Sequence, residues 1–237
     1  MSERVKRRLV LFDIDGTLLI TAGAGRRAIT AALCEAVPDP AAFTRVRFDG
    51  KTDPQIVAEL LDAAGHAGPH DAAHVRALCE RYAGLLEREL EHPETVTTIM
   101  PGVHALLDRL ERETGVVLGL LTGNLARGAE LKLRSGGLDP TRFVVGAYGS
   151  DAAHRPDLPA IAAERAAPWF GGRTPTRHEV VIIGDTPADV TCGRAIGARA
   201  IGVATGSYPA GELLSHGAHA VFADLTDTMA VAAAILD

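Results

Sequence analysis

Six short apolar runs, separated by segments of helical periodicity, constrain the fold of this chain more than any other feature. Each run is nearly continuous in apolar residues, which is typical of strands buried on both faces. Strands that alternate with helices indicate a parallel sheet, so we expect an α/β fold with a Rossmann-like parallel core. The predicted strands are residues 8–12, 116–121, 143–147, 179–183, 199–203 and 219–222. The helices expected between them include 101–113, 124–136 and 187–196.

The stretch between the first two predicted strands has a different pattern. Its apolar residues recur at helical spacing, and it carries almost no strand signal. We therefore expect an all-helical module inserted after the first strand, with helices over 24–36, 54–64 and 70–91. The predicted division is a core of residues 1–20 and 98–237 and a helical module of residues 21–97.

Polar residues follow the predicted strands at the places where a parallel sheet binds its ligands. Residues 13–17 read DIDGT, residues 122–124 read TGN, and residues 184–189 read GDTPAD, each at a strand end. A further basic residue lies in HRP, residues 154–156. Ligands of open parallel sheets bind outside the carboxyl ends of the strands. Carboxylates, a hydroxyl group and an arginine are therefore predicted to converge at one edge.

Asp13 and Asp15 raise a question of charge. Residues two apart on an extended chain point to the same side, so both carboxylates are expected at the mouth of the apolar core. Burying charge costs free energy unless another group compensates it. The sequence therefore raises the question of which group compensates these two carboxylates.

Composition excludes several classes of partner. The net charge is −6 and the pI is near 5.8, so the chain has no basic footprint for nucleic acid. No run of about 18 apolar residues is present, so we expect no membrane span. Cys34, Cys79 and Cys192 form no C-x-x-C pair, as in reduced thiols of a cytoplasmic protein. The sequence leaves the oligomeric state open.

Four segments together resemble the motifs of haloacid dehalogenase superfamily phosphatases. They are DIDGTL, LLTGN, HRPDLP and IIGDTPADV. The helical module that follows the first motif is similar to the cap of the phosphoglycolate phosphatase-like branch. The likeness covers essentially the whole chain, and the first and fourth motifs are its most specific parts. The third departs from the family pattern, because Arg155 stands where a lysine is usual.

The resemblance implies a phosphomonoester hydrolase and assigns roles to three residues. Asp13 would be the nucleophile that forms an aspartyl-phosphate. Asp15 would protonate the leaving oxygen and then activate water. Arg155 would do the work of the usual lysine and offset the charge of phosphate and of Asp13. The expected substrate is a small phosphorylated metabolite, phosphoglycolate being one candidate.

The resemblance also implies Mg²⁺ and a phosphate-binding loop. The metal ligands would be the Asp13 side chain, the Asp15 main-chain carbonyl and Asp185. Asp189 either lies at the metal or caps its own helix, since it follows Thr186 by three residues. The phosphate oxygens would be held by three consecutive residues, of which the last is also a candidate helix N-cap. These residues are Thr122, Gly123 and Asn124.

The predicted cap offers candidates for substrate selection in the polar turn RVRFDGKTDP. Lys51 is one of only three lysines in the chain and, with Thr52, is a candidate substrate contact. Asp53, just before Pro54, is expected to cap the following helix.

Three other classes of protein are compatible with parts of the sequence. A sugar phosphomutase of the β-phosphoglucomutase type shares the fold and the aspartyl chemistry, and is the leading alternative. A non-catalytic binding protein would be favoured by damaged acids at positions 13, 15 or 185, and all three are present. Residues 23–28, GAGRRA, match a dinucleotide-binding fingerprint, but the carboxylate loop separates them from the strand that such a motif should follow directly.

Overall fold

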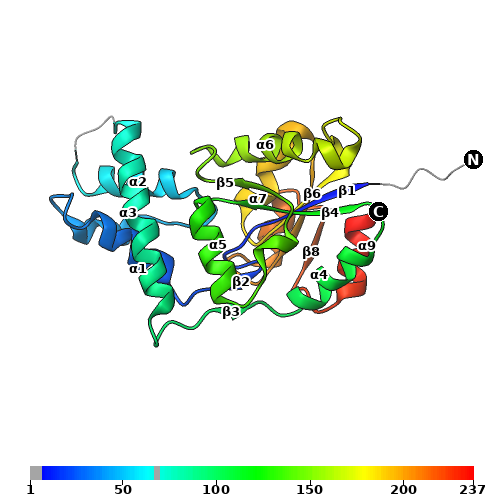
Figure 1. Ribbon diagram of the computed structural model, residues 1–237, viewed down its shortest axis with the longest axis horizontal. Helices are drawn as coiled ribbons and strands as arrows, with labels where there is room; N and C mark the ends of the chain where they lie inside the picture. The colour runs from blue at the N-terminus through cyan, green and yellow to red at the C-terminus, as the bar shows by residue number, and fades with distance from the viewer. Residues whose placement is uncertain (1–6, 67–69) are drawn as a thin grey trace, which may run out of the picture.

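A six-stranded parallel sheet forms the core of the computed structural model, which describes residues 7–66 and 70–237 (Figure 1). Its strand order is β5-β4-β1-β6-β7-β8, and every neighbouring pair is parallel. The predicted Rossmann-like α/β class is confirmed. The strands are β1 (Arg8–Phe12), β4 (Val116–Thr122), β5 (Val145–Tyr148), β6 (Val180–Gly184), β7 (Arg199–Val203) and β8 (Ala220–Phe222).

The central position of β1 determines which loops meet. Phe12, its last residue, is in register with Leu120 of β4 and with Ile183 of β6. The chain therefore leaves β1, β4 and β6 at nearly the same level and on the same edge of the sheet. The three strands are largely buried, which explains why their sequences are continuous in apolar residues.

Helices cover both faces of this sheet, as the alternating side chains of β1 require. Val10 and Phe12 pack in a cluster with α4, α5 and α9, whereas Leu9 and Leu11 pack with α6 and α7. These two groups of helices lie on opposite sides of the sheet (Figure 1). The core helices are α4 (Val103–Arg112), α5 (Ala126–Ser135), α6 (Leu158–Arg165), α7 (Pro187–Cys192), α8 (Ala210–Ser215) and α9 (Thr228–Leu236).

The helical insert, residues 21–97, has a hydrophobic cluster of its own. Helices α1 (Ala24–Leu33), α2 (Asp53–Ala63) and α3 (Ala72–Glu91) surround it and lie at one end of the sheet (Figure 1). Tyr82 and Leu86 of α3 are among its largest fully buried side chains. That this insert is a separate domain bounded at residues 21 and 97 stays a prediction, and residues 1–6 of the predicted core lie outside the described residues.

The predicted helices are present in the structure, but some of them end at other residues than predicted. The segment 187–196 is α-helical only to Cys192 and continues as a 3₁₀ turn over Gly193–Ile196. Helix α1 ends at Leu33, three residues before the predicted end. The antiparallel pair β2 (Leu19–Ile20) and β3 (Thr98–Ile99) was not predicted, since two residues carry no periodicity. This pair lies where the insert joins the core.

Candidate active site

The loop after β1 places the first carboxylate in the interior. Asp13 is only 5% exposed, and its N–H donates to the Ile183 carbonyl at 2.9 Å, which continues the register of β1 with β6. Gly16 then turns the chain with φ near +84°, a conformation that favours glycine. A Cβ at this position would lie 2.4 Å from an Asp185 oxygen, so the loop can approach Asp185 only because residue 16 has no side chain.

Asp13, Asp185 and Asp189 form a buried acidic cluster, with one oxygen of each lying within 4.8 Å of the others. Burial raises the pKa of Asp13 to about 7 and that of Asp185 to about 8, and the neighbouring carboxylates add to both shifts. The Thr17 hydroxyl donates to Asp185 at 3.0 Å. Clustered carboxylate oxygens with raised pKa values are a donor set that fits a hard divalent cation such as Mg²⁺.

Asp189 caps its own helix and also lies in the acidic cluster. Its backbone N–H and the Thr186 side chain form a capping box at the start of α7, and one carboxylate oxygen accepts from both the N–H and the hydroxyl of Thr186. The other oxygen accepts from Arg155. Because both oxygens are engaged, Asp189 has less capacity than Asp185 for direct metal coordination.

Arg155 lies in the acidic cluster although it is remote in sequence. It begins the 3₁₀ turn Arg155–Asp157, and Pro156 at the next position favours that start. The side chain is 4% exposed, and one Nη lies 3.2 Å from an Asp13 oxygen and also contacts Asp189. Its Nε is buried and has no acceptor among the described residues.

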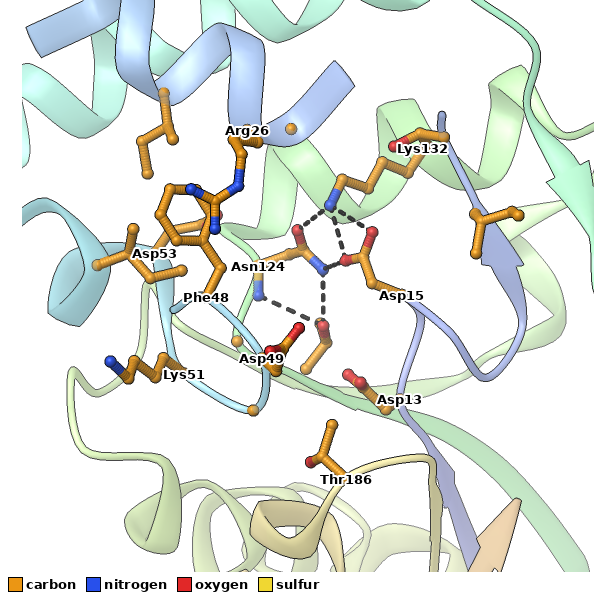
Figure 2. Close-up of a pocket in the computed structure, with 18 of the residues that line it drawn as sticks. Asp13, Asp15, Arg26, Phe48, Asp49, Lys51, Asp53, Asn124, Lys132 and Thr186 are labelled. Atoms are coloured by element: carbon orange, nitrogen blue, oxygen red, sulfur yellow. Dashed lines mark hydrogen bonds and ion pairs between the residues drawn. The ribbon is translucent and has the colours of Figure 1, made fainter. Parts of the chain in front are cut away.

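The segment Thr122–Asn124 links the end of β4 to α5 beside this cluster. Asn124 donates from its side chain to Thr122 Oγ1 at 2.8 Å and to Asp15 at 2.7 Å (Figure 2). Its predicted role as the N-cap of the following helix is wrong. Helix α5 begins at Ala126 with Leu125 as the capping residue, and the Asn124 amide is directed into the site instead.

Lys132 is a residue of the site that the sequence analysis passed over. It lies on α5, is 4% exposed, and donates from Nζ to both oxygens of Asp15 at 2.7–2.8 Å and to Asn124 Oδ1 at 2.7 Å (Figure 2). Asp15 is 45% exposed and directed toward this lysine, whereas Asp13 is paired with Arg155. The two carboxylates therefore have different cationic partners. One signal was available: Lys132 is one of three lysines and follows Asn124 by eight residues, about two helical turns.

The turn before α2 contacts the core directly. Asp53 donates its N–H to the Gly123 carbonyl at 2.7 Å and accepts from the Leu125 N–H at 2.8 Å. Burial raises the pKa of Asp53 to about 6. The predicted N-cap is corrected: Thr52 caps α2 by accepting from Gln55, because Asp53 is already the first helical residue.

The two candidate substrate contacts of the insert have different positions. Lys51 lines a cavity of about 440 Å³ that also contains Asp13 and Thr122, and its ammonium forms an ion pair with Glu59. Thr52 is fully buried, does not line this cavity, and donates to the Ala153 carbonyl at 2.5 Å. The structure brings Lys51 to the cavity and assigns Thr52 to the contact between insert and core.

Comparison with known proteins identifies the family. A sequence profile of haloacid dehalogenase-like hydrolases matches residues 7–197. The chain is 30% identical over 227 residues to a phosphoglycolate phosphatase of Cereibacter sphaeroides (strain ATCC 17029 / ATH 2.4.9), covering 93% of this chain and 96% of the relative.

Two solved structures have the same fold. CbbY from Rhodobacter sphaeroides in complex with phosphate superimposes with a TM-score of 0.69 at 18% identity, over 93% of this chain and 96% of its own. A Thermotoga maritima protein provisionally assigned as a β-phosphoglucomutase gives a TM-score of 0.62 at 20% identity, over 95% and 98%.

These matches define a class of enzyme, the phosphatases built on a parallel sheet with a carboxylate loop after the first strand. The chain belongs to the haloacid dehalogenase-like hydrolase family and is similar to its phosphoglycolate phosphatase branch. In the part of the chain that the structure describes, no helix is both long and apolar enough to cross a bilayer.

Proposed function

We propose that this chain is a Mg²⁺-dependent phosphomonoester hydrolase that acts through an aspartyl-phosphate on a small phosphorylated metabolite. The proposal rests on the buried contact between Asp13 and Arg155 within the acidic cluster. Phosphoglycolate is the first candidate substrate, because the curated relatives are phosphoglycolate phosphatases.

The first half of the reaction is assigned to Asp13 and Asp15. An Asp13 oxygen attacks phosphorus while the bond from phosphorus to the leaving oxygen breaks, and Asp15 gives that oxygen its proton. Arg155, 3.2 Å from Asp13, offsets the charge of the nucleophile and of the phosphoryl oxygens together. The Thr122 hydroxyl and the amides of the TGN segment are assigned to the remaining phosphoryl oxygens.

The second half returns the enzyme to its starting state. Asp15 takes a proton from water, whose oxygen attacks phosphorus, and inorganic phosphate leaves as the bond from Asp13 to phosphorus breaks. Lys132 and Asn124 hold Asp15 at the cavity during both steps. Bound Mg²⁺ would neutralise the charge that accumulates on the phosphoryl oxygens and on the carboxylates. Its ligands would be the side chains of Asp13 and Asp185 and the main-chain carbonyl of Asp15, with Asp189 nearby.

The helical insert would act as the cap over this site and select the substrate. Its turn before α2 contacts the TGN segment through Asp53, and Lys51 lines the same cavity as Asp13. Lids of this kind exclude water and complete the catalytic site.

The test is phosphate release from a panel of phosphomonoesters with Mg²⁺, comparing the unmodified protein with Asp13→Asn. We expect the variant to fold and to lose turnover by about 10⁴-fold or more, because an amide is a poor nucleophile. Asp71→Asn is a matched control, since Asp71 is exposed and its side chain caps no helix. Substantial Mg²⁺-dependent turnover in folded Asp13→Asn would refute the assignment of the nucleophile.

A sugar phosphomutase is the second candidate, favoured by the structural likeness to the Thermotoga maritima protein. The two activities differ in the fate of the phosphoryl group. A phosphatase releases it to water, whereas a mutase returns it to another hydroxyl of the sugar. Incubation with glucose 1-phosphate separates them: glucose 6-phosphate without equivalent inorganic phosphate would support the mutase.

A further inference from the structure

Four cationic side chains line the cavity in the described part of the chain, and three of them are engaged with carboxylates. Arg155 contacts Asp13 and Asp189, and Lys132 contacts Asp15. Lys51 contacts Glu59. The fourth, Arg26, forms no ion pair with any carboxylate of the described residues. Asp49, which lines the cavity as well, is paired with Arg47 at 3.4 Å instead.

Arg26 is held in a defined orientation even without a carboxylate. Its guanidinium carbon lies 3.7 Å from the centre of the Phe48 ring, and one Nη donates to the Val46 carbonyl at 3.1 Å. Stacking on an aromatic ring fixes the plane of a guanidinium, and a single donated hydrogen bond leaves most of its five N–H donors available. Figure 2 shows Arg26 and Phe48 on the side of the cavity away from Asp13.

We propose that Arg26 binds a second anionic group of the substrate, a carboxylate or a second phosphate, while the reacting phosphoryl group lies at Asp13. The inference rests on the proposed function for the position of the reacting group. It narrows the substrate class to small phosphomonoesters with a charged tail. A planar guanidinium fork suits both anions, because each can accept two parallel hydrogen bonds. The Phe48 ring below the fork would exclude water from one face of that contact.

The neighbouring arginine provides a matched control. Arg27 lies next to Arg26 on α1, but it pairs with Glu89 at 2.7 Å, donates to the Ala22 carbonyl, and does not line the cavity. Substitution at either position removes one positive charge from the same exposed helical turn. Only Arg26→Met should therefore affect recognition of a tail inside the cavity.

The decisive experiment is a binding measurement that requires no turnover. Isothermal titration with Mg²⁺ present compares ethylphosphonate, which has an uncharged tail, with phosphonoacetate and with propane-1,3-bisphosphonate. We expect one or both charged ligands to bind the unmodified protein about 10- to 100-fold more tightly than ethylphosphonate. In Arg26→Met the ratio of the two affinities should fall to about 1, and in Arg26→Lys it should be intermediate. In Arg27→Met the ratio should be the same as in the unmodified protein. The stronger of the two charged ligands identifies the tail as carboxylate or phosphate.

Two results would overturn the proposal. One is equal affinity of the unmodified protein for charged and uncharged ligands, and the other is an unchanged ratio in Arg26→Met. Turnover of phosphoglycolate and ethyl phosphate is measured separately. If the unmodified protein hydrolyses no phosphomonoester, the proposed function fails, whereas the affinity ratio still decides whether Arg26 is an anion subsite.

Discussion

At the scale of single residues, Asp13 and Asp15 form ion pairs with two different cationic side chains. Asp13 lies in the interior with Arg155, and Asp15 lies at the cavity edge with Lys132. The two neighbouring aspartates therefore differ in both exposure and cationic partner, and burial raises the pKa of Asp13 to about 7.

Lys132 provides a test of this arrangement. In Lys132→Met, Asp15 keeps its bond from Asn124 but loses the ammonium that contacts both of its oxygens. We expect kcat to fall by about 10- to 100-fold with a smaller change in KM, as for other residues that orient a reacting group. Steady-state kinetics and circular dichroism of Lys132→Met and Lys132→Arg measure this. A kcat within twofold of the parent in folded Lys132→Met would contradict the role.

Arg155 and Lys132 show which kinds of site residue could be predicted from the sequence. Arg155 was predicted from its place before a proline and between two motifs, and the structure places it beside Asp13. Lys132 was not predicted as a site residue, because it lies within a helix and follows no strand end, and only the three-dimensional path of α5 brings its ammonium to Asp15. Local sequence identifies a residue that follows a strand end more easily than one that reaches the same site from two helical turns away.

At the scale of elements, the class of each long segment was predictable and its contacts were not. Continuous apolar strands and helical periodicity were sufficient for the six-stranded sheet and the three helices of the insert. The antiparallel pair β2 and β3 and the contact of Asp53 with the TGN segment depend on how the insert sits against the core. Such contacts join positions distant in sequence and leave no periodic pattern.

Gly123 lies at a close contact between insert and core. A Cβ there would lie 1.9 Å from the Lys51 carbonyl oxygen, so Gly123→Ala requires the turn before α2 to move away. A displacement of about 1 Å near reacting groups can cost about 10²-fold in rate, and we expect a loss of that size in kcat/KM. Hydrogen exchange should show faster exchange of the Asp53 and Leu125 amides, which now bond across this contact.

Gly128→Ala is the control for this prediction. Gly128 lies on α5, close to the TGN segment, but a Cβ at this position would contact only the Leu86 side chain, at 3.4 Å. Alanine also favours a helix over glycine. Equal activity of Gly123→Ala and Gly128→Ala would show that the contact of the insert with the TGN segment does not matter for catalysis.

At the scale of the whole molecule, the acidic cluster makes the free energy of unfolding depend on pH. The pKa values of Asp13 and Asp185, about 7 and about 8, lie above the ordinary 3.8. Between pH 4 and 8 the folded protein therefore holds protons that the unfolded chain has released. Without a divalent cation, the contribution of this pair to the free energy of unfolding falls as pH rises through that window.

On the proposed function, Mg²⁺ should reverse this loss, because it would bind the ionised carboxylates and only in the folded state. A ligand at 100 times its Kd stabilises by about 2.7 kcal/mol, which for a chain of this size raises Tm by about 5–10 °C. We expect that rise at pH 8 and less than half of it at pH 5.5, where protons compete with the metal for Asp13 and Asp185. Thermal unfolding with and without Mg²⁺ at both pH values measures the difference, and Asp185→Asn should respond weakly at either pH. The same Tm rise at pH 5.5 and pH 8, or a full response in Asp185→Asn, would mean that the cation binds elsewhere, because a cation at the acidic cluster must compete with the protons of Asp13 and Asp185.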